Sequence, residues 1–272
     1  MTRSDLIEQI QLKRSLLCVG LDSDIQRIPD SLKKHEDAVF EFNKAIIDAT
    51  HSYCVSYKIN TAFYESRGVK GWQSLEKTIE YINENYHNHF TIADAKRGDI
   101  GNTADQYAKA FFEAMDFDAV TVAPYMGSDS ILPFLKYSEK FTIVLGLTSN
   151  ASASEFQLHG EHYPMYKEVL SKTARYAHAE RLMYVVGATK AEALQEIRAI
   201  LPDHFLLIPG VGAQGGSLEE VLNHGLIKDY GLLINSSRGI IFASEGDDFA
   251  IKAGEAAADL QKQMSTLLQK SF

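Results

Sequence analysis

Eight short apolar runs, separated by longer stretches of helical periodicity, constrain the fold of this chain more than any other feature. Most runs are continuously apolar rather than alternating, which is typical of parallel strands covered on both faces. They occupy residues 15–22, 53–60, 90–96, 119–125, 142–148, 182–189, 205–212 and 231–239. Amphipathic stretches lie between them, among them residues 38–52, 104–115, 190–201 and 247–268. Eight strands alternating with helices predict an α/β chain folded as a (β/α)8 TIM barrel.

A doubly wound open sheet is the alternative architecture. Its phosphate-binding fingerprint would follow the first strand, but "GLDSDIQR" (20–27) contains neither a G-x-G-x-x-G nor a Walker A pattern. No linker rich in Pro, Gly or Ser divides the chain. The sequence therefore predicts one barrel domain over residues 1–272.

Several helix starts carry a capping-box pattern, in which a Ser or Thr precedes a Glu or Gln by three residues. The pairs are Thr103 with Gln106, Thr189 with Glu192, and Ser217 with Glu220. Residues 1–15 have no apolar core of the signal-peptide kind, and we expect them to form an amphipathic helix.

The formal net charge of -9 disfavours a partner that is nucleic acid or an anionic membrane. No apolar run approaches the roughly 20 residues that span a bilayer, so a cytoplasmic protein is expected. Cys18 and Cys54 lie in apolar runs and are predicted to be buried thiols rather than a disulfide. His159 and His162 form an H-x-x-H pair without further ligands of zinc spacing, which favours a solvated loop.

Charged side chains collect where the second and third runs end. Asp94 and Lys96 are two residues apart and would share a face of a strand, and Lys58 ends the neighbouring strand. Asp99 follows in the next loop. We call Lys58, Asp94, Lys96 and Asp99 the charged array. Because barrel enzymes place reacting groups at the carboxyl ends of strands, the array is a candidate active site.

The alternating signs of the charged array would keep all four groups ionised. Lys96 would then be a fixed ammonium beside a fixed carboxylate, which is a proton donor that needs no metal. A structural salt-bridge network at the mouth of the barrel is the alternative interpretation.

A candidate phosphate site follows the seventh and eighth runs. "IPGVGAQGG" (208–216) is rich in glycine, Gln214 lies within it, and Ser217 then begins a helix. Arg238 ends the eighth run, and these two loops are the common phosphate site of such barrels. Tight turns alone are the alternative explanation of the glycines.

Three further features leave two interpretations each. Asp22 either accepts from a sugar hydroxyl or caps the following helix. The polar segment 147–157 is either a lid over a heterocycle or a solvated loop. The stripe of Tyr107, Phe111 and Phe112 is explained by core packing, with a dimer interface as the second choice.

The segment "DAKRGDIGNTA" (94–104) resembles the D-x-K-x-x-D-I-G-N-T signature of the orotidine 5'-phosphate decarboxylase family. "GLD" and "YKIN" before this segment and "PGVGAQGG" and "SSRGI" after it occur in that family's order, so the resemblance covers residues 15 to 242. The chain length and the segments "KIN", "LTSN" and "GAQGG" are similar to those of the longer bacterial branch of the family.

The resemblance implies decarboxylation of orotidine monophosphate to uridine monophosphate in pyrimidine biosynthesis, without a cofactor. Lys96 would protonate C6 of the pyrimidine, and Asp94 would lie beside the departing carboxylate. Lys58 and Asp99 would complete the charged array. A homodimer is also implied, in which Asp99 and Thr103 reach into the partner's site.

The same resemblance implies the groups that bind the substrate. Asp22 and Asn60 would hold ribose hydroxyls, and Ser149 would meet the edge of the pyrimidine. The phosphate would be held by Gly212, Gln214, Arg238 and Gly239.

Two rival functions remain. Relatives such as 3-hexulose-6-phosphate synthase or a keto-gulonate phosphate decarboxylase use magnesium with an extra acidic ligand, but here the second strand ends in Lys58. A catalytically silent phosphate-binding barrel belongs to another class, and it would not need the complete charged array.

Overall fold

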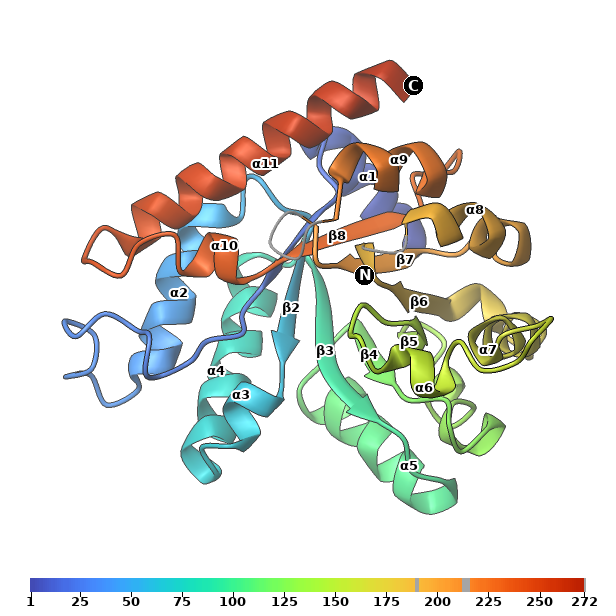
Figure 1. The fold of residues 1–272 in the computed structure, drawn as a ribbon. Coiled ribbons are helices and arrows are strands. Elements are labelled where there is room, and N and C mark those ends of the chain that lie inside the picture. Colours follow the sequence, from blue (N-terminus) through green and yellow to red (C-terminus); the bar gives the residue numbers. More distant parts are fainter. Residues whose placement is uncertain (189–190, 212–215, 272) are drawn as a thin grey trace. The chain divides into compact units, whose positions relative to one another are not determined.

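The computed structural model describes residues 1–188, 191–211 and 216–271. Within these ranges, parallel strands follow one another in chain order from β1 to β8 as a closed barrel (Figure 1). This topology confirms the predicted (β/α)8 TIM barrel. The strands are β1 Leu17–Gly20, β2 Ser56–Asn60, β3 Phe90–Arg97, β4 Ala119–Val122, β5 Phe141–Leu147, β6 Leu182–Val186, β7 Leu206–Pro209 and β8 Leu232–Ser236.

Helices connect the strands, as the amphipathic stretches predict. They are α1 Arg3–Lys13, α2 Ala38–Thr50, α3 Ala62–Glu65, α4 Val69–Asn85, α5 Gly101–Lys109, α6 Ala153–Phe156, α7 Met165–Thr173, α8 Ala191–Ile200, α9 Leu218–Gly225, α10 Arg238–Ile241 and α11 Phe249–Ser271. The N-terminal segment forms α1, as expected, and buries Leu6 and Ile10.

The chain divides into two compact units by its internal contacts. The first unit comprises Met1–Ala95, Glu113–Asp118 and Ser236–Phe272, and the second comprises Lys96–Phe112 and Ala119–Asn235. The single-domain organisation expected from the sequence stays a prediction.

In the first unit, β1, β2 and β3 form a parallel ladder in which Lys58 pairs with Gly20 on one side and Ile92 on the other. Helices α4 and α11 lie beside α2 (Figure 1). The apolar face of α2 is buried through Phe42, whose ring stacks on Phe249 of α11 at 5.1 Å between centroids. This packing fixes the strands whose ends carry the first half of the site.

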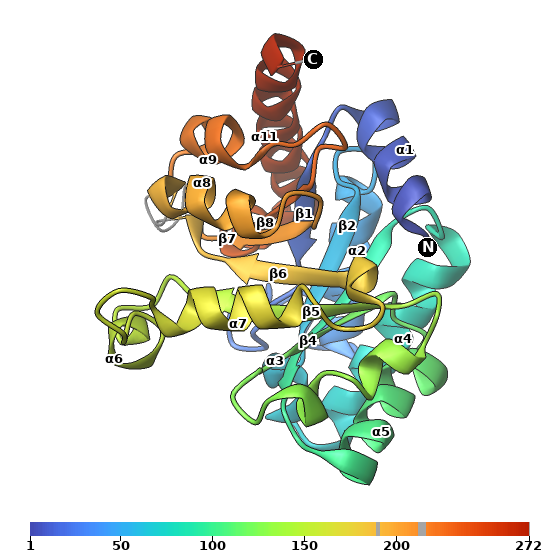
Figure 2. The same cartoon turned by 90° about the vertical axis from the view of Figure 1, so that its right-hand side faces the viewer.

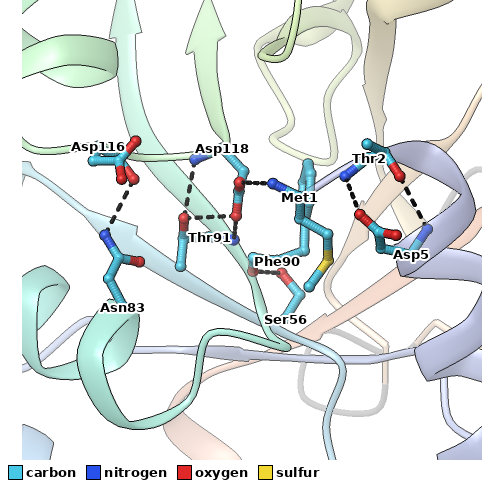
Figure 3. A network of polar contacts seen from close by, with 9 residues as sticks. All are labelled: Met1, Thr2, Asp5, Ser56, Asn83, Phe90, Thr91, Asp116 and Asp118. Carbon is cyan, nitrogen blue, oxygen red and sulfur yellow. Dashed lines mark hydrogen bonds and ion pairs between the residues drawn. The ribbon is translucent and has the colours of Figure 1, made fainter.

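The start of the chain is tied into the same unit by a polar network (Figure 3). The amino group of Met1 donates to Oδ1 of Asp118 at 2.5 Å. Oδ2 of Asp118 accepts from the backbone N–H and the hydroxyl of Thr91 at 2.9 and 3.0 Å. Thr2 and Asp5 form a capping box at the start of α1. Helix α1 is therefore held at its first turn, close to the start of β3.

In the second unit, β4 to β8 form a continuous parallel ladder, and α8 lies beside α9 (Figure 2). Arg198 of α8 fastens the segments that precede β7 and β8. Its guanidinium donates to the carbonyls of Gly225, His204 and Gly231 at 2.6 to 2.8 Å, and to that of Leu201 at 3.1 Å.

Two details of the helices differ from the sequence prediction. The predicted start at Thr103 is wrong, because α5 begins at Gly101 with Ile100 as its N-cap. The stretch 104–115 is also not one regular helix, since α5 ends at Lys109 and a π-helical turn covers Ala110–Ala114. A π turn holds one more residue than an α turn, which rotates the residues that follow it.

Other local predictions are confirmed. Ser217 caps α9 by accepting from the N–H of Glu220 at 3.3 Å, whereas the pattern at Thr189 lies outside the described residues. In the predicted aromatic stripe, Phe111 and Phe112 are buried, as core packing requires, and Tyr107 is half-buried. Cys18 and Cys54 are free and buried.

Candidate active site

Lys58 is the centre of the polar cluster in the first unit. Its side chain is 5% exposed, and Nζ lies 3.2 Å from Oδ1 of Asp22 and 3.1 Å from Oδ2 of Asp94. The register of the ladder explains the arrangement: Asn60 pairs with Asp94, and Gly20, two residues before Asp22, pairs with Lys58. The predicted proximity of Lys58 to Asp94 is confirmed.

The electrostatics of this cluster keep Lys58 charged. Burial alone would lower the pKa of Lys58, but the charges of Asp22 and Asp94 outweigh it and raise that pKa well above its ordinary value. The ammonium in turn compensates two half-buried carboxylates that would otherwise repel each other. The cluster is therefore a preformed ionic site, at the end of β2 where the sequence predicts it.

Asp22 does not cap a helix, so that alternative is wrong. The next helix of the structure, α2, has Asp37 as its N-cap, and Asp37 accepts from the N–H of Phe40 at 3.1 Å. Oδ1 of Asp22 instead accepts from the ammonium of Lys58 at 3.2 Å.

The other predicted binding residues of the first unit lie after β2 and β8. Oδ1 of Asn60 accepts from the N–H of Ala62 at 3.2 Å and so shapes the turn into α3. Arg238 and Gly239 begin α10 and are exposed. Among the described residues Arg238 forms no ion pair. Gly212 and Gln214 lie outside the described residues.

Lys96 lies at the end of β3, in the second unit, with an unusual backbone. Its φ is 47°, in the left-handed region, and its N–H donates to Oγ1 of Thr121 at 2.9 Å. Strand alternation is interrupted at such a residue. A face shared with Asp94 therefore does not follow from spacing alone, and it stays a prediction.

Asp99 and Thr103 lie where the sequence places them, in the loop after β3 and in the first turn of α5. Oδ1 of Asp99 accepts from the N–H of Ile100 at 2.8 Å, and Thr103 is exposed. Ile100 between them is 45% exposed. The assembly of all four charged residues into one array stays a prediction.

Ser149 follows β5 and is held from two sides. Gly187, just after β6, approaches it so closely that a Cβ there would lie 2.8 Å from Cβ of Ser149. On the other side, the amide of Gln157 clasps Thr148: Oε1 accepts from the N–H and Nε2 donates to the hydroxyl, both at 2.8 Å. The two ends of the polar segment 147–157 are therefore joined by hydrogen bonds, and the loop between them contains α6.

Sequence reasoning missed two residues that shape the site, Thr121 and Gln157. Thr121 is a polar residue in the apolar run of β4, and Gln157 closes the polar segment after β5. Their residue types gave a weak indication of a structural role, because a buried hydroxyl inside a strand and a side-chain amide at the end of a loop each need a hydrogen-bond partner.

Across residues 1–188, 191–211 and 216–271, no three His, Cys, Asp or Glu side chains are grouped as metal ligands, and His159 and His162 are exposed. No helix in those ranges is long and apolar enough to span a membrane.

Comparison with known proteins places the chain in a family. Residues 15–252 match the model of the orotidine 5'-phosphate decarboxylase / HUMPS family. The chain is 58% identical to orotidine 5'-phosphate decarboxylase of Flavobacterium johnsoniae, with 100% of both chains covered. It is 59% identical to that of Christiangramia forsetii, covering 99% of this chain and 100% of the relative.

A solved structure of Leishmania donovani OMP decarboxylase is similar in fold. Its TM-score is 0.83 at 36% identity, and 98% of each chain is covered. The matches extend well beyond the signature segment and span nearly the whole chain. The chain belongs to the orotidine 5'-phosphate decarboxylase / HUMPS family.

Proposed function

We propose that this protein decarboxylates orotidine 5'-monophosphate to uridine 5'-monophosphate in pyrimidine biosynthesis, without a cofactor. Family membership over residues 15–252 and the names of relatives above 50% identity support the activity. The structural observation that carries the proposal is the buried Lys58 ammonium held between Asp22 and Asp94. We also place the protein in the cytoplasm.

The chemistry requires stabilisation of negative charge at C6. When CO2 leaves, its bonding electron pair stays on C6 of the pyrimidine, which is a poor carbanion in water. The ammonium of Lys96, held about 3 Å away, would stabilise that charge as it develops and then give its proton to C6. Asp94, which pairs with Lys58 at 3.1 Å, would face the departing carboxylate.

Substrate binding would offset the cost of placing the substrate carboxylate near Asp94. Asp22 and Asn60 hold ribose hydroxyls in this proposal, and Ser149 meets the pyrimidine edge. The phosphate is held by Arg238 and Gly239 together with Gly212 and Gln214. Binding free energy gained at the phosphate, far from C6, can offset the cost of that placement.

The ion pairs of Lys58 with Asp22 and Asp94 disfavour a magnesium-dependent function like that of the sugar-phosphate relatives. A divalent cation bound by Asp22 and Asp94 would have to displace the ammonium of Lys58, which lies within 3.2 Å of both carboxylates. Two cations at that separation repel each other strongly in a partly buried site.

One assay tests the activity. Purified protein is mixed with orotidine monophosphate in the presence of EDTA, and the loss of orotate absorbance is followed. Turnover that survives EDTA is expected. Folded protein without turnover would sink the proposal and leave the silent phosphate-binding barrel, whereas turnover abolished by EDTA would favour the metal-dependent relatives.

We further propose a homodimer in which Asp99 and Thr103 complete the partner's site. Their position in and after the loop that follows β3, next to the exposed Ile100, supports this arrangement. Mixed dimers of Lys96→Ala and Asp99→Ala chains should regain activity, because one site of each mixed dimer keeps both residues. Verified mixed dimers without rescue would refute the shared site.

A further inference from the structure

We propose that Thr121 is a positioning residue for Lys96: its hydroxyl holds the Lys96 backbone in the left-handed conformation from which the ammonium is presented. The inference rests on the proposed role of Lys96 as proton donor. It deepens that role by naming what fixes the donor in place. Thr121 lies on β4 and is fully buried.

The backbone of Lys96 needs an external constraint. Its φ of 47° is a conformation that residues other than glycine adopt rarely, and lysine has no side-chain group that stabilises it locally. Such a residue persists only where the surrounding structure holds it, and functional sites are where these residues collect. What holds Lys96 is therefore a question about function as well as about folding.

Thr121 supplies the constraint directly. The N–H of Lys96 donates to Oγ1 of Thr121 at 2.9 Å, and threonine is β-branched, so its χ1 angle is restricted. The acceptor itself cannot move far, because β4 is paired with β5 at Thr121 and Ile143. The hydrogen bond thus joins the end of β3 to a residue of β4 that is itself paired with β5.

The residue after Lys96 is fastened to the same part of the unit. The carbonyl of Arg97 accepts from the N–H of Ala123 at 2.7 Å. The guanidinium of Arg97 lies over the rings of Tyr107 and Phe111, at 5.1 and 5.3 Å from their centroids. With Arg97 fixed on one side, the Thr121 hydrogen bond on the other determines the conformation at Lys96.

Placement of this backbone matters because the lysine side chain is long and flexible. A misplacement of about 1 Å at a reacting group can lower a rate about a hundredfold. Binding of the nucleotide would depend on other residues, namely Asp22, Ser149 and Arg238. Loss of the Thr121 hydroxyl should therefore lower kcat while affinity for the product stays the same.

The test replaces Thr121 by Val, which has nearly the same shape but no acceptor. We expect kcat to fall by about 10- to 100-fold, with the Kd for uridine monophosphate unchanged. Thr121→Ser, which keeps the hydroxyl, should restore most of the rate. Thr142→Val is the matched control, because Thr142 of β5 is also fully buried and its Oγ1 has no hydrogen-bond partner among the described residues.

A second measurement does not depend on turnover. Hydrogen exchange of the Lys96 amide, followed by NMR, should be about tenfold faster in Thr121→Val than in wild type and in Thr142→Val. If Thr121→Val does not fold, Thr121→Ala is measured in its place. Wild type without turnover would refute the proposed function, and the Lys96 amide would still decide the role of Thr121.

Three results would overturn the inference. They are an undiminished kcat in Thr121→Val, an unchanged exchange rate at Lys96, and equal losses of activity in Thr121→Val and Thr142→Val.

Discussion

The side-chain nitrogen of Lys13 lies 2.7 Å from Nε2 of His89, an unusually short separation for two basic groups. Lys13 also donates to the carbonyls of His51 and Cys54, both at 2.8 Å. His89 is buried, and burial together with the positive charge of Lys13 lowers the pKa of His89 to about 4. The folded protein therefore needs this histidine neutral.

Stability should consequently depend on pH between about 6.5 and 4. The unfolded chain binds a proton at His89 below its ordinary pKa of 6.5, whereas the folded chain does so only near 4. The free energy of unfolding is thus expected to fall by up to about 3 kcal/mol as the pH drops through that window. Urea unfolding of wild type and His89→Gln measures it, and the variant should show a flatter dependence.

The exposed His35 provides the control, because His35→Gln should keep the pH dependence of wild type. Equal dependences in wild type and His89→Gln would show that His89 does not carry the effect.

Lys58→Met should destabilise the protein and abolish turnover. The substitution leaves Asp22 and Asp94 half-buried and without their cation, and removing one partner of a buried ion pair costs about 3–5 kcal/mol. Lys33→Met is the comparison, since its pair with Asp30 is exposed and contributes less than about 1 kcal/mol. Chemical unfolding of both variants distinguishes them, and similar losses would contradict the ionic role of Lys58.

Gln157→Leu should raise KM for the nucleotide by about tenfold, or about 1.4 kcal/mol, with little change in thermal stability. The variant loses both hydrogen bonds that clasp Thr148 and so loosens the loop that carries Ser149. Gln157→Glu keeps an acceptor for the Thr148 amide and should lie between wild type and Gln157→Leu. Unchanged steady-state kinetics in Gln157→Leu would show that the clasp does not position Ser149.

Thiol reagents should not label the native protein. Burial raises the pKa of Cys18 to about 12 and that of Cys54 to about 11, and the thiolate is the reactive form. A colorimetric thiol assay is expected to detect almost no cysteine under native conditions and two per chain in denaturant. Rapid labelling of the folded protein would mean that one of these cysteines is accessible.

The sequence was sufficient for the architecture because continuous apolar runs and amphipathic stretches report burial directly. It was less informative at the ends of elements. The capping pattern at Thr103 did not determine the start of α5, since the N-cap is Ile100, three residues earlier. The π turn at Ala110–Ala114 has no signature in the hydrophobic period.

For the site, the order of the strands made the proximity of Lys58 and Asp94 predictable, because side chains near the carboxyl ends of neighbouring parallel strands lie at the same edge of the sheet. The left-handed backbone of Lys96 was not predictable, since nothing local favours it and its hydrogen-bond acceptor, Thr121, is 25 residues away in the chain. Conformations imposed by distant contacts escape any analysis based on local pattern.

Lys58 is a single cation shared by two acids, Asp22 and Asp94. In the proposed reaction these acids have separate tasks, Asp22 at the sugar and Asp94 at the scissile bond. A change at either carboxylate redistributes the attraction of Lys58 toward the other, so the two acids are energetically coupled. Contact between Asp22 and a ribose hydroxyl would thus alter the field that Asp94 exerts, and recognition of the sugar would adjust the electrostatics of bond cleavage through one shared counter-ion.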